Sequence, residues 1–61
     1  MRKELTVKQA RTKAELTQMQ VAVVLEIGHN TYHRWESANR IPRKLFRKMF
    51  WNLMKEHGVE Q

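Results

Sequence analysis

Cysteine is absent from this 61-residue chain, and glycine and proline are scarce, with two residues and one residue respectively. The absence of cysteine excludes a disulfide scaffold and a zinc site built on thiolates. Because helix-breaking residues are so few and the apolar residues recur at intervals of three and four, the sequence favours an all-α fold with short connections. A chain of this length forms one domain at most, so we assign residues 1–61 to a single domain.

Long apolar runs and acidic residues are also lacking. No apolar stretch approaches the ~18 residues of a membrane-spanning helix, and the first residues do not resemble a signal peptide, so we expect a cytoplasmic protein with no membrane partner. Only 6 Asp and Glu stand against 12 Lys and Arg, which gives a net charge of +6. This excess favours a polyanionic partner, either nucleic acid or an anionic membrane surface. A membrane surface would require a basic amphipathic helix with a free apolar face, and the only candidate, the last helix, needs its apolar face for the core.

Two helix starts are marked by capping boxes, in which a threonine is followed three residues later by glutamine. Thr6–Gln9 predicts a helix over about residues 7–15, and Thr17–Gln20 predicts one over about residues 18–25. Helical spacing assigns the inward faces of these two segments to six apolar residues: Val7, Ala10, Ala14, Val21, Ala22 and Leu25.

A third helix is expected from Gly28 or His29 to about Ser37, with two unlike faces. Tyr32 and Trp35 point one way, towards the core. The opposite face carries only polar and basic side chains: His29, Asn30, His33, Arg34 and Ser37.

A fourth helix is expected to hold Pro42 in its first turn and to end at Gly58. Its predicted core stripe consists of five large apolar residues: Leu45, Phe46, Met49, Phe50 and Leu53.

The polar face of the third helix carries the side chains that read base edges in DNA. Asn30 suits adenine, and Arg34 suits the O6 and N7 acceptors of guanine. An ordinary solvated face, which is the alternative, would carry Glu and Lys instead. The only acid on this helix, Glu36, lies off the polar strip.

The segment 7–42 resembles the helix-turn-helix family of the phage Cro and repressor proteins. The residues that carry the resemblance are Arg11, Leu16-Thr17-Gln18, Ala22, Leu25, Ile27, Thr31, Arg34-Trp35-Glu36 and Arg40-Ile41-Pro42. The resemblance implies a small all-α bundle of four to five helices with a helix-turn-helix, as in lambda-repressor-like DNA-binding domains. It also implies a phage or prophage regulator that acts at the nucleoid of a bacterial cytoplasm.

The resemblance assigns roles by position. It implies that Gln18 contacts a DNA phosphate and that Arg11 and Glu36 form an interior salt bridge. The residues expected to contact bases and nearby phosphates are His29, Asn30, Thr31, His33 and Arg34. The residues expected along the DNA backbone, besides Gln18, are Ser37, Arg40 and Arg43.

The chain also departs from the family pattern. Glu15, Glu26 and Ala38 stand where the family usually has glycine with positive φ, so either the turns differ locally or the domain gives up some stability. Gly28 replaces the usual Ser or Thr cap of the recognition helix, which weakens that cap by a few tenths of a kcal/mol.

Four apolar residues lie off the expected core faces and are candidates for a dimer or partner surface: Trp51, Met54, Met19 and Val23. For Trp51 the alternative is coverage by the N-terminal segment. His29 and His33 have a spacing that could share a metal ion, but no third ligand is placed near them. We therefore expect no metal, no cofactor, no small-molecule ligand and no enzymatic activity.

These observations predict a sequence-specific regulator of transcription that binds double-stranded DNA. In this hypothesis it is a Cro-like repressor that binds an inverted repeat as a homodimer, or as a dimer that forms only on DNA, with its third helix in the major groove. Two alternatives stay open: an antitoxin-type autoregulator that binds a toxin, and a protein-interaction module that has lost DNA binding.

Overall fold

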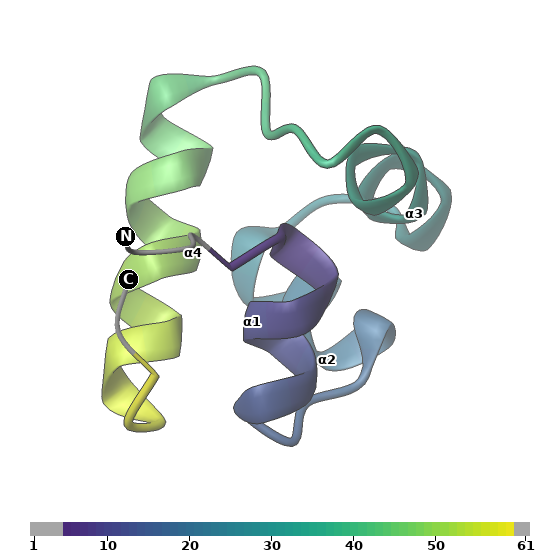
Figure 1. Cartoon of the computed structure of the whole chain (residues 1–61). Helices are drawn as coiled ribbons and strands as arrows, with labels where there is room; N and C mark the ends of the chain where they lie inside the picture. The colour runs from purple at the N-terminus through teal and green to yellow at the C-terminus, as the bar shows by residue number, and fades with distance from the viewer. Residues whose placement is uncertain (1–4, 60–61) are drawn as a thin grey trace.

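The computed structural model describes residues 5–59 of the chain. These residues form four α-helices and no strand, with bounds α1 Val7–Lys13, α2 Gln18–Leu25, α3 His29–Ala38 and α4 Lys44–Glu56. The predicted all-α class is confirmed. Helix α2 packs against both α3 and α4, and Figure 1 shows α3 and α4 on opposite sides of α1 and α2. None of the four helices has the length and apolar character needed to cross a membrane.

Both predicted capping boxes are present. At the start of α1, the Thr6 hydroxyl accepts from the Gln9 backbone N–H at 3.0 Å, and the Gln9 side chain accepts from the Thr6 N–H at 2.9 Å. At the start of α2, Thr17 and Gln20 make the same two bonds, at 3.1 Å and 2.8 Å. Each box supplies partners for backbone groups that the helix itself cannot pair.

The chain adopts the left-handed conformation at the ends of the first three helices. Glu15 has φ 61° and Glu26 has φ 59°, as in the glycine-type turns expected from the resemblance. Because the chain turns at Glu15, α1 ends at Lys13 rather than at residue 15. The third such residue is Asn39, with φ 51°, whereas Ala38 stays helical. Asparagine tolerates this conformation better than other non-glycine residues.

All six residues predicted on the inward faces of α1 and α2 are buried. Tyr32 of α3 and Phe50 of α4 have no exposed surface and are among the largest side chains of the core. Trp35 is half-buried, and its ring lies 5.4 Å from that of Phe46. This ring pair helps to join α3 to α4.

The prediction for α4 was wrong in three details. Helix α4 begins at Lys44, so Pro42 precedes it rather than occupying its first turn. Leu45 is 65% exposed, whereas Met54 is completely buried, although Leu45 was expected in the core and Met54 on the surface. The reason is a rotation of the buried face. It is centred on Phe50, Leu53 and Met54, whose i, i+3, i+4 spacing puts them on one side of a helix.

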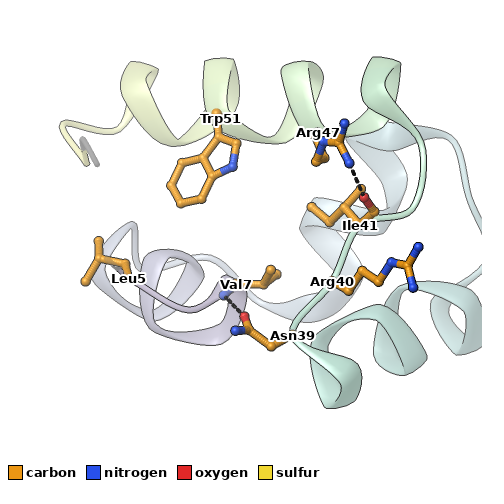
Figure 2. A pocket seen from close by; sticks show the side chains of 7 residues that line it. All are labelled: Leu5, Val7, Asn39, Arg40, Ile41, Arg47 and Trp51. Atoms are coloured by element: carbon orange, nitrogen blue, oxygen red, sulfur yellow. Dashed lines mark hydrogen bonds between the residues drawn. The ribbon is translucent and has the colours of Figure 1, made fainter. Parts of the chain in front are cut away.

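Trp51 is half-buried and contacts Phe50 edge-on, with ring centroids 5.0 Å apart. It lies across an open pocket of about 260 Å³ from Leu5 and Val7, as Figure 2 shows. Trp51 therefore lies over the start of α1. This position is close to the alternative prediction, in which the N-terminal segment covers Trp51.

Candidate nucleic-acid interface

The outer face of α3 is polar, basic and open to solvent. The six residues expected to contact DNA from this helix are all exposed: His29, Asn30, Thr31, His33, Arg34 and Ser37. Tyr32, by contrast, is buried completely, and only 9% of Glu36 is exposed. The separation of α3 into two faces is therefore as predicted, and its outer face presents no carboxylate.

The Arg11–Glu36 pair accounts for the inward position of that carboxylate. Arg11 Nε donates to Glu36 Oε2 at 2.6 Å, and Arg11 Nη2 donates to Oε1 at 3.3 Å. The exposed fractions of the two side chains are 14% and 4%. Arg11 Nη1 also donates to the Leu16 carbonyl at 2.8 Å, so one guanidinium joins α1, the connection before α2, and α3.

The pKa values of this pair follow from its contacts. Burial alone raises the pKa of Glu36, but hydrogen bonds from Arg11 and Gln18 outweigh it and bring the pKa below its ordinary value. The hydrogen bond to Glu36 raises the pKa of Arg11 in turn. Both groups are therefore charged at neutral pH.

Gln18, the first residue of α2, connects this ion pair to the outer face of α3. Its amide nitrogen donates to Glu36 Oε1 at 2.8 Å and lies 3.4 Å from His33 Nδ1. Its amide oxygen lies 3.0 Å from His29 Nε2. Sequence reasoning had assigned Gln18 and the two histidines to DNA separately. It had not predicted that they contact one another.

The Tyr32 hydroxyl is the one buried side-chain polar atom without a hydrogen-bond partner within residues 5–59. Burial is the main cause that raises the pKa of Tyr32, and the polar contact of its hydroxyl with the nearby Glu36 side chain and the negative charge of Glu36 raise it further. The tyrosine therefore stays neutral and contributes to the core through its ring. No sequence signal distinguished it from an ordinary buried aromatic residue.

The backbone candidates Arg40 and Arg43 follow α3 in the connection to α4, and both are exposed. Arg47 Nη1 donates to the Ile41 carbonyl at 3.3 Å, which holds this connection against α4. Asn39 holds its other end, because its Oδ1 accepts from the Val7 N–H at 3.0 Å (Figure 2). Sequence reasoning missed this anchor. An asparagine directly after a predicted helix was the available signal.

Arg34 on α3 and Arg40 and Arg43 after it are exposed cations. Arg11–Glu36 is the only salt bridge within the described residues, so Arg34, Arg40 and Arg43 have no carboxylate partner there.

Of the four candidates for a partner surface, Met19 and Val23 are 56% and 66% exposed.

Comparisons with protein-family models, with curated proteins and with solved structures gave no match for this chain.

Proposed function

We propose that this protein is a sequence-specific double-stranded DNA-binding regulator of transcription that inserts α3 into the major groove. The observation that carries the proposal is the outer face of α3. Six side chains able to donate or accept hydrogen bonds are exposed on it, while its one carboxylate is withdrawn into the Arg11 pair. A helix face of this kind suits the base edges of the major groove and is not repelled by phosphates.

Backbone contacts would fix the register of the helix on DNA. Gln18 lies at the start of α2, where backbone N–H groups lack helical partners. The start of α3 has no side-chain cap at Gly28, so its first N–H groups remain free for a phosphate oxygen. Arg40 and Arg43, which are exposed and have no carboxylate partner within residues 5–59, add positive charge after α3. In this proposal α2, the three-residue connection and α3 form a helix-turn-helix.

Occupancy of an operator as a two-fold dimer is the simplest mode of regulation for such a domain. Two copies would place their α3 helices one DNA turn apart, ~34 Å, and would read an inverted repeat. No contact within the described chain identifies the dimer surface. The exposed pair Met19 and Val23 on α2 is our candidate for it.

A second candidate function rests on the same apolar pair. In an antitoxin-type autoregulator, Met19 and Val23 would bind a toxin chain instead of a second copy of this chain. The oligomeric state of the purified protein discriminates the two. A dimer lost in Val23→Lys favours self-association, whereas a monomer unaffected by Val23→Lys leaves the surface for another protein.

Selection of binding sites from random duplex DNA tests the proposal. We expect one motif to be enriched, with two half-sites related by inversion. Asn30→Ala and Arg34→Ala should each weaken binding by ~1–3 kcal/mol and relax the preference at one position. Lys55→Ala, at the far end of α4, is the control and should leave the motif unchanged. Recovery of random sequence after repeated rounds would contradict sequence-specific binding.

A further inference from the structure

His29 and His33 lie one helical turn apart on the outer face of α3, and both contact the side chain of Gln18. A neutral imidazole has one donor nitrogen and one acceptor nitrogen. Which nitrogen carries the proton therefore decides what each histidine offers to a ligand. The contacts of Gln18 settle this question for both rings.

The orientation of the Gln18 amide follows from Glu36. The Glu36 carboxylate is ionised and can only accept hydrogen bonds. The Gln18 atom that lies 2.8 Å from Glu36 Oε1 must therefore be the amide nitrogen, and the amide oxygen must point elsewhere. Arg11 also holds this carboxylate in place, through Nε and Nη2.

Opposite consequences follow for the two histidines. The Gln18 oxygen lies 3.0 Å from His29 Nε2, so Nε2 must carry the proton and donate, which leaves His29 Nδ1 as an acceptor. The Gln18 amide nitrogen also lies 3.4 Å from His33 Nδ1, and because an amide nitrogen can only donate, a hydrogen bond between them requires this Nδ1 to accept. The proton of His33 then lies on Nε2, across the ring, and is free to donate.

We propose that Gln18 is a specificity-determining residue of the α3 surface, because its Glu36-oriented amide makes His29 an acceptor and His33 a donor towards the ligand. This inference rests on the proposed DNA-binding function. On a base edge, His29 Nδ1 matches an amino group, as on adenine N6 or cytosine N4. His33 Nε2–H matches an acceptor, such as guanine N7 or O6.

The first test needs no DNA. In protein labelled with 15N-histidine at pH 8.5, two-bond nitrogen–proton correlations report which nitrogen of each neutral ring carries the proton. We expect His29 and His33 each to carry the proton on Nε2. The His29 Nε2 proton should exchange with solvent slowly. His57, exposed directly after α4, is the internal reference, since its side chain makes no hydrogen bond within residues 5–59.

Gln18→Met keeps the length of the side chain and removes both amide contacts. The His29 Nε2 proton should then exchange about fivefold to tenfold faster, the effect of losing one hydrogen bond. Gln20→Met is the matched control, since it weakens the cap of α2 but leaves the Gln18 contacts intact. A proton on Nδ1 of either ring in the wild type would overturn the proposal, as would unchanged exchange in Gln18→Met.

The second test uses a selected DNA site and base analogues. At the base pair whose preference is lost in His29→Ala, removal of the amino group should weaken wild-type binding by about threefold to tenfold. At the base pair lost in His33→Ala, replacement of a purine N7 by C–H should do the same. In Gln18→Met both analogue effects should fall below about twofold, because each released ring adopts either tautomer. The reverse pattern of analogue effects would overturn the proposal.

The two tests separate the two ideas. Expected tautomers without a selectable DNA site would contradict the proposed function and leave the orientation of the histidines by Gln18 intact. A selectable site with the wrong tautomers would contradict the role of Gln18 alone.

Discussion

Replacement of Arg11 by methionine isolates the contribution of the Arg11–Glu36 pair to stability. Methionine keeps most of the aliphatic part of Arg11 and removes its guanidinium. Glu36, with 4% of its side chain exposed, would then keep only the hydrogen bond from Gln18. The Leu16 carbonyl would lose its bond from Arg11 as well.

The expected loss is large for a domain of this size. Removal of one partner from a buried ion pair costs about 3–5 kcal/mol. Because Arg11 is itself 14% exposed and Gln18 still donates to Glu36, we expect the lower end, about 3 kcal/mol. A 61-residue domain has a total unfolding free energy of only about 3–9 kcal/mol at ~0.05–0.15 kcal/mol per residue.

Urea unfolding followed by far-ultraviolet circular dichroism measures this loss. With a slope of about 1 kcal/mol per M, the midpoint should fall by about 3 M, or the variant should be unfolded already in buffer. Lys13→Met, an exposed charge removed from the same helix, should change the free energy of unfolding by no more than about 0.5 kcal/mol.

A double variant completes the experiment. Arg11→Met with Glu36→Met removes both charges, so it should be more stable than Arg11→Met alone, which leaves a buried carboxylate. A loss below about 1 kcal/mol in Arg11→Met, or a double variant whose cost is the sum of the single ones, would refute the reasoning.

Three further predictions concern stability. The pKa of Glu36 is lowered in the folded state, so the contribution of its charge to stability is complete above the unfolded pKa of about 4.3 and is lost as pH falls through the folded pKa. The difference in unfolding free energy between wild type and Glu36→Gln, measured in urea, should therefore shrink between pH 6 and pH 3. A constant difference would contradict this prediction. Glu26→Gly should raise the thermal midpoint of unfolding by a few degrees, because glycine adopts a positive φ without strain. Asn39→Gly should lower the midpoint, because the hydrogen bond to Val7 is lost. Equal shifts of the same sign would argue against this contrast. Tyr32→Phe should leave the free energy of unfolding unchanged or raise it by up to about 1 kcal/mol, because the buried hydroxyl makes no well-aligned hydrogen bond within residues 5–59. A clear loss of stability would show that its contact with the Glu36 side chain is a stabilising hydrogen bond.

Local signals in the sequence predicted the first three helices well. The capping boxes at Thr6 and Thr17 fixed the starts of α1 and α2, because a side chain three residues away satisfies each cap. The two faces of α3 followed from helical spacing alone. Glu15 also took the positive φ that its position implied.

The details of α4 and of the site depend on packing and could not be read from the sequence. The apolar residues of α4 are spread widely enough to allow two similar buried faces, and the contact with α2 selects the one containing Met54 rather than Leu45. The Gln18 contacts join residues 11 to 18 positions apart in sequence, so they arise only when α2 and α3 pack. The Asn39 bond to Val7 spans 32 positions for the same reason.

The affinity ratio between a selected duplex and its scrambled counterpart, measured by fluorescence anisotropy at several salt concentrations, tests the central claim most directly. We expect both affinities to fall steeply as salt rises, because phosphate contacts release counterions. The ratio near physiological salt should reach about 10³ or more in favour of the selected site. Equal affinity for both duplexes at every salt concentration would contradict sequence-specific recognition by α3.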